Sequence, residues 1–241
     1  MAIYFFDPFI KKLGYTSESE KDGLLTTLYG NLKKIGFEPK HIVDVGANRG
    51  TWTRKTMCFF PDAYYTLVEP QKELSNYFKD LLSKPTVIFY PVGAGSKSET
   101  LKFTFADRDD SSSFVYNQED VIKRGFVQKD IAIKPLNEIL QENAEWPVPD
   151  IIKIDAEGLD IDVLKGASNY FGKTEIFMVE AAVFEKEFQN SVSTVITFMD
   201  EIDYKLFEIT DLNRPFQPQF LWLMEMVFIK KGGLIDSYKV I

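Results

Sequence analysis

Acidic and glycine residues in one short stretch of the chain have the types and spacing of a cofactor site. The stretch runs Asp44-Val45-Gly46-Ala47-Asn48-Arg49-Gly50 directly after an apolar segment, and Glu69-Pro70 follows at the end of a second apolar segment. Glycine tolerates the positive φ of a tight strand-to-helix turn and lets the backbone approach a ligand. Because a carboxylate at the second strand end can accept hydrogen bonds from ribose hydroxyls, the pattern predicts a site for the adenosine half of a cofactor.

The glycine spacing favours S-adenosylmethionine (SAM) over a dinucleotide. A dinucleotide site requires G-x-G-x-x-G, whose third glycine lets a helix pack closely beneath the pyrophosphate, whereas this chain has only Gly46-x-x-x-Gly50. SAM has no phosphate and carries a sulfonium, an ammonium and a carboxylate. Backbone amides of the loop are expected to bind that carboxylate, and Asp44 is expected to face the cationic part. A tight turn without a ligand is the alternative interpretation, and a nicotinamide dehydrogenase is the least favoured function.

A second group of acids follows a later apolar segment, Ile151-Ile152-Lys153-Ile154-Asp155-Ala156-Glu157-Gly158. Ligands of open α/β sheets bind at the carboxyl ends of the strands. Asp155 and Glu157 are therefore expected to face the same crevice as the glycine stretch, with Glu180 at the end of the next strand. Buried carboxylates without partners are costly, so this cluster requires a cation, a metal or hydrogen-bond donors. Alternatively, Asp155 and Glu157 cap the following helix, since acids favour helix N-termini.

These acids suit the transfer of a methyl group to a hydroxyl. The acceptor oxygen must lie about 3 Å from the methyl carbon, in line with the sulfur, and it loses its proton during the reaction. A positioned carboxylate that accepts the proton contributes about 10²–10⁴-fold, and we predict Asp155 for this role, with Glu157 as the second candidate. Lys153 is expected to keep the acids ionised. The only histidine, His41, precedes the first strand and is predicted to be structural.

Alternating strands and helices connect these motifs. We expect strands at 42–45, 64–69, 86–92, 151–155 and 175–181, and helices at 51–60, 71–83, about 159–171 and 191–202. This alternation implies a parallel sheet with right-handed crossovers. Two final strands, 204–209 and 221–229, have no helix between them and predict a C-terminal antiparallel hairpin. The predicted fold class is therefore α/β, a Rossmann-like class I methyltransferase fold with a mostly parallel seven-stranded sheet.

The alternating run 101–105 predicts an extra hairpin after the third strand, followed by a short strand at 130–134 and a helix at 136–143. Residues 107–128 are predicted to form a polar loop that acts as a lid over the acceptor, since long loops in compact domains are usually functional or disordered. Its serines Ser111, Ser112 and Ser113 can donate hydrogen bonds to a sugar, and Phe114 supplies an apolar edge. The loop 211–220, with Arg214, Phe216 and Phe220, is expected to shape the same pocket.

An amphipathic helix is predicted at 19–35, with one apolar face made of Leu24, Leu25, Leu28, Leu32 and Ile35. Gly36 ends this helix. We therefore expect residues 1–40 to be an N-terminal helical extension and residues 41–241 to be the methyltransferase domain.

The bulk composition restricts the partners. The net charge of −8 and the sequence pI of about 4.9 disfavour binding to a phosphate backbone, so we expect no nucleic-acid partner. No apolar run reaches the roughly 18 residues of a membrane span, and the apolar start is broken by Asp7 and Pro8, unlike a signal peptide. A cytoplasmic protein is expected, with Cys58 as a small buried residue. We predict no metal ligands and make no prediction of oligomeric state.

The chain resembles the FkbM family of SAM-dependent methyltransferases over about residues 40–210. The matching pieces are Asp44-Val45-Gly46-Ala47-Asn48-Arg49-Gly50, Val68-Glu69-Pro70, Val92-Gly93-Ala94-Gly95, Ser112-Ser113-Phe114, Ile152-Lys153-Ile154-Asp155-Ala156-Glu157-Gly158 and Val163-Leu164-Lys165-Gly166-Ala167. The Lys-Ile-Asp-x-Glu-Gly run with the later Leu-Lys-Gly-Ala is the most specific part. Two departures are Asn137, where the family often has Asp, and Asp160, where it often has Glu nearby; we assign Asp160 no role.

The resemblance implies O-methylation of sugars or polyketide-type natural products. On this basis we assign residues to three sites. The cofactor site comprises Asp44, Gly46, Ala47, Asn48, Gly50, Glu69, Pro70, Gly93, Ala94 and Asp155; the catalytic group comprises Asp155, Glu157 and Lys153; the acceptor site comprises Ser112, Ser113, Phe114 and Glu180. The predicted partner is a small-molecule or glycan acceptor. A metal-assisted O-methyltransferase of a small diol and a non-catalytic SAM-binding protein are the alternatives, and chelator sensitivity separates the first of these from the main prediction.

Overall fold

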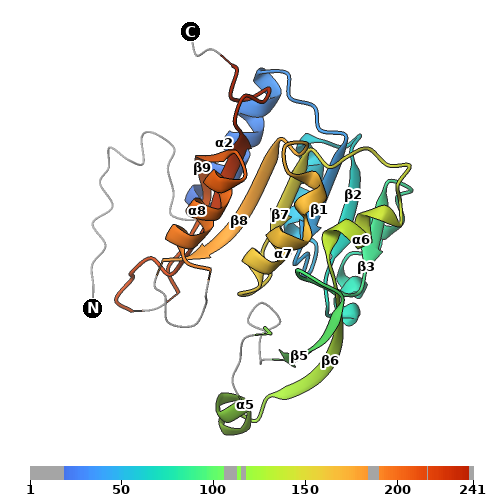
Figure 1. Ribbon diagram of the computed structural model, residues 1–241, viewed down its shortest axis with the longest axis vertical. Helices are drawn as coiled ribbons and strands as arrows, with labels where there is room; N and C mark the ends of the chain where they lie inside the picture. The colour runs from blue at the N-terminus through green and yellow to red at the C-terminus, as the bar shows by residue number, and fades with distance from the viewer. Residues whose placement is uncertain (1–18, 106–112, 115–117, 184–189, 216, 239–241) are drawn as a thin grey trace.

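A central seven-stranded sheet organises the computed structural model, which describes residues 19–105, 113–114, 118–183, 190–215 and 217–238 (Figure 1). The strand order is β3-β2-β1-β7-β8-β10-β9. The strands are β1 (His41–Val45), β2 (Tyr64–Val68), β3 (Val87–Tyr90), β7 (Ile151–Ile154), β8 (Ile176–Ala182), β9 (Tyr204–Asn213) and β10 (Leu223–Lys230). Pairing is parallel from β3 to β8, whereas β10 runs antiparallel to both β8 and β9. This arrangement confirms the Rossmann-like α/β fold with a C-terminal antiparallel hairpin.

Helices cover both faces of the sheet and create two separate apolar cores. One face carries α2 (Ser19–Lys34), α3 (Thr51–Phe59), the 3₁₀ helix η1 (Lys72–Tyr77) and α4 (Lys79–Leu82); the other carries α6 (Leu136–Gln141), α7 (Asp160–Gly166), the 3₁₀ helix η3 (Ser168–Tyr170) and α8 (Val192–Glu201). In Figure 1, α6 and α7 lie in front of the sheet and α2 lies behind it. Because β1 and β7 are buried between the two layers, both strands are mostly apolar, apart from His41, Asp44 and Lys153.

Two predicted helices are shorter than the sequence indicated. The segment 71–83 divides into η1 and α4 at Phe78, whose φ of −129° is not helical and whose fully buried ring packs on Phe89. The segment 159–171 ends its α-helix at Gly166 and continues as η3. In the first case the burial of one aromatic ring overrides the helical pattern, because tertiary packing outweighs local propensity.

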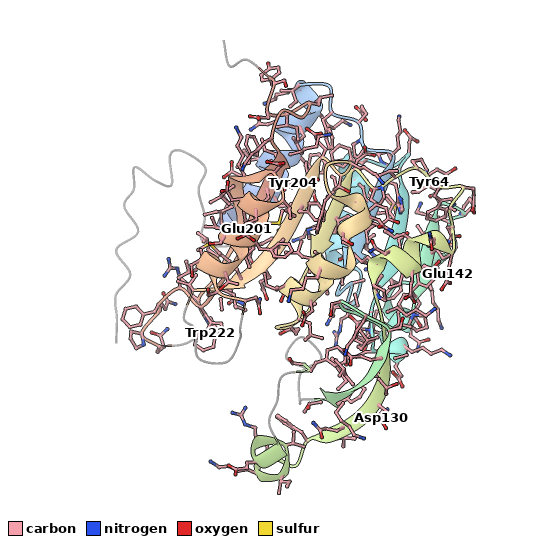
Figure 2. The ribbon with its side chains drawn as sticks, viewed as in Figure 1. Tyr64, Asp130, Glu142, Glu201, Tyr204 and Trp222 are labelled. Atoms are coloured by element: carbon pink, nitrogen blue, oxygen red, sulfur yellow. The ribbon has the colours of Figure 1, made fainter. Side chains whose placement is uncertain are left out.

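A second, three-stranded sheet forms an arm that projects beyond the carboxyl ends of the parallel strands (Figure 1). It contains β4 (Gly93–Ala94), β5 (Glu99–Phe105) and β6 (Val127–Lys134), with β5 antiparallel to β6. The extra hairpin after the third strand is therefore confirmed. Figure 2 shows Asp130 on this arm, away from the main sheet, where its carboxylate pairs with Lys102 at 2.7 Å. The predicted loop 107–128 is not entirely a loop, because α5 (Gln118–Arg124) lies within it.

Helix α2 joins the core of the main sheet. Leu25, Leu28, Tyr29 and Leu32 are buried in the same cluster as residues of β1 and β2, whereas Leu24 is 36% exposed and does not belong to the buried face, contrary to the prediction. The helix ends as expected at Gly36, whose φ is 79°. The N–H of Gly36 donates to Lys33 O and that of Phe37 to Leu32 O, both at 3.0 Å, which is the pattern of a Schellman motif. The division into an extension of 1–40 and a domain of 41–241 stays a prediction.

The single histidine and the single cysteine lie away from the strand ends that carry the acids. His41 is buried, with Nδ1 2.7 Å from Pro147 O and Nε2 2.9 Å from Thr66 Oγ1. Burial lowers the pKa of His41 to about 4, although its hydrogen bond to Pro147 acts to raise it. The ring is therefore neutral, in keeping with the predicted structural role. Cys58 is exposed, and the prediction of burial was wrong, because α3 turns Thr53 and Thr56 toward the core instead.

Across the described ranges, no helix is long and apolar enough to cross a membrane.

Candidate functional site

A pocket opens where β1, β2 and β7 end, beside the switch point between β1 and β7, where ligands of such sheets bind. Its empty volume is about 630 Å³ when the open solvent at its mouth is included. Seven of the predicted cofactor residues line it, namely Gly46, Asn48, Glu69, Pro70, Gly93, Ala94 and Asp155. Glu157 and Phe114 line it as well. Asp44, Ala47, Gly50 and Lys153 are not among the lining residues, although each lies in or beside the same loops.

The glycine turn is shaped by the protein's own backbone. Gly46 has a φ of 75°, and a Cβ at this position would lie 1.9 Å from the carbonyl oxygen of Asp155, so only glycine fits. Its N–H and that of Ala47 donate to Val68 O at 2.9 and 3.2 Å, and the N–H of Gly50 donates to Ala47 O at 2.7 Å. These amides therefore hold the turn against β2. Each of these three N–H groups already has a partner within the protein, and the contact of the loop amides with a ligand carboxylate stays a prediction.

Glu69 connects the end of β2 to the glycine turn. Its Oε2 accepts the N–H of Asn48 at 2.9 Å, and its Oε1 accepts the N–H of Gln71 at 2.8 Å. Burial raises the pKa of Glu69 to about 7, although both N–H groups and the charge of Lys153 act in the opposite direction. A carboxylate offers about four lone-pair sites, so each oxygen retains capacity for one further donor. The side chain is thus held rigidly at the pocket wall with acceptor capacity left.

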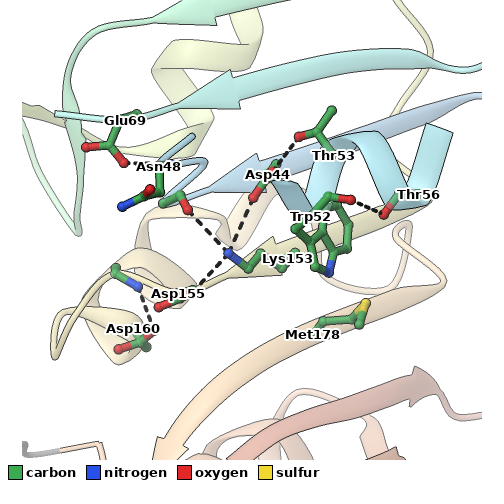
Figure 3. A network of polar contacts seen from close by, with 12 residues as sticks. Asp44, Asn48, Trp52, Thr53, Thr56, Glu69, Lys153, Asp155, Asp160 and Met178 are labelled. Carbon is green, nitrogen blue, oxygen red and sulfur yellow. Dashed lines mark hydrogen bonds and ion pairs between the residues drawn. The ribbon is translucent and has the colours of Figure 1, made fainter. Parts of the chain in front are cut away.

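Lys153 lies behind the pocket, between two carboxylates (Figure 3). Its Nζ is 3.4 Å from Asp44 Oδ1, 3.1 Å from Asp155 Oδ2 and 3.3 Å from the carbonyl oxygen of Gly46. Asp44 is fully buried and also accepts a hydrogen bond from Thr53 Oγ1 at 2.5 Å. Asp44 therefore faces a cation, as predicted, but the cation belongs to the protein rather than to a ligand.

The charge of Lys153 is strongly favoured. Burial alone would lower the pKa of this lysine, but the carboxylates of Asp155, Asp44 and Glu225 raise it well above its ordinary value. Lys153 is therefore a permanent cation that balances the charge of Asp155 from behind. Lys153 does not line the pocket, and its predicted place in the catalytic group stays a prediction.

Asp155 and Glu157 lie on the turn between β7 and α7. Asp155 retains 34% exposure of its side chain at the pocket, and Glu157 has a left-handed φ of 49°. The alternative prediction, that these two acids cap the helix, is wrong: the N-cap position of α7 is Leu159, without a side-chain cap. The acid that accepts hydrogen bonds from the turn is Asp160, to which the sequence analysis gave no role.

The predicted acceptor residues are placed differently from one another. Ser113 is buried, and its Oγ donates to the carbonyl oxygen of Glu157 at 2.6 Å, so it links the arm to the turn after β7. Phe114 lines the pocket, and its ring centroid is 4.6 Å from that of Phe103. Glu180 lies within β8 and does not line the pocket; burial, together with the negative charges of the neighbouring acids, raises its pKa well above the ordinary value. Ser112 lies outside the described residues, as do the other residues of 107–112 and residues 115–117 of the predicted lid.

The loop 211–220 does not contribute to this pocket in the residues that the structure describes. Arg214 Nη1 donates to the carbonyl oxygen of Gln219 at 3.0 Å, and Phe220 is 71% exposed. Phe216 lies outside the described residues.

Sequence reasoning missed two residues of interest. Phe103 lines the pocket from β5, and its signal was the alternation of apolar residues in the run 101–105. Glu225 lies opposite Glu180 in the register of β10 with β8 and accepts a hydrogen bond from Thr210 Oγ1 at 2.5 Å. Burial raises the pKa of Glu225 to about 7, opposed by the charge of Lys153. Its signal was an acid inside an otherwise apolar strand.

Within the described ranges, no group of three or more His, Cys, Asp or Glu side chains is arranged to hold a metal ion.

Residues 44–206, more than half of the chain, match the sequence profile of the methyltransferase FkbM domain. The crystal structure of a methyltransferase FkbM from Methylobacillus flagellatus KT superposes with a TM-score of 0.50 at 16% identity, covering 78% of this chain and 43% of that one. A putative O-methyltransferase from Klebsiella pneumoniae gives a TM-score of 0.50 at 13% identity, covering 90% and 81% of the two chains. The chain therefore spans less than half the length of the Methylobacillus protein, and both likenesses show the fold. A search of curated proteins found no match.

Proposed function

Because the chain belongs to the family of FkbM methyltransferase domains, we propose that it transfers a methyl group from SAM to a hydroxyl of a carbohydrate or natural-product acceptor. The observation that carries the proposal is the placement of two acids, Glu69 and Asp155, on either side of the Gly46 turn in one pocket. They follow β2 and β7, which are far apart in the sequence and lie on either side of β1 in the sheet.

The pocket residues fit SAM in their chemistry. Glu69 is held by two N–H groups with acceptor capacity left, which suits the two hydroxyls of a ribose. Asp155 and Glu157 provide negative charge for an ammonium or a sulfonium, and Phe103 and Phe114 provide an aromatic wall on which a flat base can stack.

SAM, when bound, supplies a methyl group activated by the positive charge of the sulfonium. Asp155 is exposed at the pocket and is backed by Lys153 at 3.1 Å, so we assign it the role of accepting the proton of the acceptor hydroxyl. Glu157, on the same turn, is the second candidate for this role. Lys153 balances the charge of Asp155 and, through its contact with the Gly46 carbonyl at 3.3 Å, fixes the glycine turn relative to the end of β7.

The test is methyl transfer from isotopically labelled SAM to a panel of sugars, polyols and hydroxylated natural products, followed by mass spectrometry. We expect at least one hydroxylated acceptor to gain a single labelled methyl group on oxygen, and the Asp155→Asn variant to lose this activity. A chelator arm separates the metal-assisted alternative, because only that alternative predicts loss of activity with a chelator. Binding of SAM without transfer to any acceptor would favour the non-catalytic alternative instead.

A further inference from the structure

The turn that carries Asp155 and Glu157 is held by a carboxylate outside the pocket. Asp160, the first residue of α7, is 1% exposed. Its Oδ1 accepts the N–H of Ala156 at 2.9 Å, and its Oδ2 accepts the N–H of Gly158 at 3.2 Å. These two N–H groups belong to the residues directly before and after Glu157. The backbone on both sides of Glu157 is therefore fixed by one side chain.

A third donor reaches the same carboxylate from a different part of the sheet. Asn190, which is 3% exposed, donates through Nδ2 to Asp160 Oδ2 at 2.8 Å. Its carbonyl oxygen accepts the N–H of Ala182 at 3.0 Å, so it is anchored to the end of β8. The contact thus connects the segment after β8 to the turn after β7.

Two acceptors set the orientation of the Asn190 amide: Nδ2 donates to Asp160 Oδ2 at 2.8 Å and to the carbonyl oxygen of Glu180 at 3.4 Å. In this orientation Asn190 Oδ1 is buried and finds no partner among the residues that the structure describes. An unpaired buried acceptor is unfavourable, but the reversed amide would direct its oxygen at the carboxylate of Asp160. The hydrogen bond to Asp160, which is the shorter of the two, therefore favours this amide orientation together with the Glu180 carbonyl, in spite of the unpaired Oδ1.

From these contacts we propose that Asp160 and Asn190 form a clasp that positions Asp155 and Glu157 for methyl transfer. The clasp consists of Asp160, Asn190 and the N–H groups of Ala156 and Gly158. Ser113 holds the opposite side of the same turn through its hydrogen bond to the Glu157 carbonyl. Asp160 and Asn190 are absent from the pocket lining, so they are positioning residues, and their role in transfer rests on the proposed function.

The chemistry of the clasp requires a carboxylate at position 160. All three of its partners are donors, and they divide between the two oxygens. In an Asp160→Asn variant, either orientation of the amide directs an NH₂ group at one or more of these donors. The substitution keeps the size of the side chain but cannot keep all three hydrogen bonds.

The test is hydrogen–deuterium exchange of the full-length protein without ligand, with resolution at the amides of residues 156 and 158. We expect Asp160→Asn and Asn190→Ala to accelerate exchange at both amides by about tenfold or more, while exchange in β1 and β8 stays unchanged. The matched control is Asp162→Asn, which removes an acid from the same first turn of α7. Asp162 is 46% exposed and pairs with Lys165 at 3.1 Å, so its loss should leave both amides as they are.

The second measurement determines kcat and the KM for the acceptor, alongside the affinity for S-adenosylhomocysteine. We expect both clasp variants to lower kcat about tenfold or more, with a smaller change in the KM for the acceptor, and Asp162→Asn to match the unmodified protein. Unchanged exchange at residues 156 and 158, or faster exchange spread equally over the whole protein, would overturn the clasp. If the unmodified protein binds no S-adenosylhomocysteine, the proposed function fails, and the exchange result still decides whether the clasp holds the turn.

Discussion

Replacement of Lys153 by methionine is the substitution for which the structure predicts the largest effect. The lysine side chain is 5% exposed and Asp44 is fully buried, with 3.4 Å between Nζ and Oδ1. Removal of one partner of a buried pair leaves the other charge uncompensated, which costs about 3–5 kcal/mol. Asp155 adds little to this figure, because its side chain is 34% exposed and water screens its charge. The free energy of unfolding of a domain is about 5–15 kcal/mol. Lys153→Met should therefore remove a large part of that stability.

A double variant separates the charge effect from the loss of packing. Lys153→Met combined with Asp44→Asn no longer leaves the fully buried Asp44 carboxylate uncompensated, so we expect it to be more stable than Lys153→Met alone by at least about 1 kcal/mol. Lys165→Met is the matched control, because Lys165 is 53% exposed and pairs with Asp162 on the surface; its loss should cost less than about 1 kcal/mol.

The assay is equilibrium unfolding in urea, followed by circular dichroism. If the free energy of unfolding of Lys153→Met lies within about 0.5 kcal/mol of that of the unmodified protein, the buried pair of Lys153 and Asp44 does not stabilise the fold as we propose. The same conclusion follows if the double variant is destabilised by the sum of the two single changes, since additive effects would mean that the two charges do not interact.

Three further predictions concern the pocket. Asp155→Asn should lower kcat and kcat/KM together and leave the affinity for S-adenosylhomocysteine nearly unchanged, as measured by steady-state kinetics and calorimetry; normal turnover would transfer the base role to the other acid of the turn. Because burial raises the pKa of Glu69 from 4.5 to about 7, the folded protein without ligand binds more protons than the unfolded chain in this window and loses stability as the pH rises through it. Ribose hydroxyls favour the ionised form, so the affinity for S-adenosylhomocysteine should rise up to about pH 7 and then level off, and Glu69→Gln should abolish the rise. Gly46→Ala should lower the free energy of unfolding in urea by at least about 2 kcal/mol, because its Cβ would meet Asp155 O at 1.9 Å. The control is Gly36→Ala, where φ is 79° and a Cβ would meet no atom within 4 Å; it should lower the free energy of unfolding by only about 1–2 kcal/mol.

The strand ends and their acids were predictable because polar residues interrupt apolar runs there. Glu69 and Asp155 each follow a strand. Because ligands of open α/β sheets bind at the carboxyl ends of the strands, the sequence predicts that these two acids lie in one crevice. The hairpin of β9 and β10 was predictable for a similar reason, since two apolar runs had no helical segment between them.

The contacts made by adjacent strands could not be predicted from the sequence. Asp44 and Lys153 are register partners of β1 and β7, yet Lys153 follows Gly46, whose carbonyl it also contacts, by 107 positions in the sequence. The same holds for Gly46, which is a glycine because the backbone of Asp155 occupies the space beside it. Gly166 is a parallel case, since a Cβ there would lie 2.0 Å from Gly95 O. Sequence patterns indicate that a glycine is needed, but the neighbouring segment that requires it appears only in the fold.

The most direct test of the central claim is calorimetric titration with S-adenosylhomocysteine and, separately, with NAD. We expect saturable binding of S-adenosylhomocysteine with a Kd of about micromolar order, loss of this binding in the Glu69→Ala variant, and no binding of NAD. Binding of NAD without binding of S-adenosylhomocysteine would contradict the assignment of the pocket.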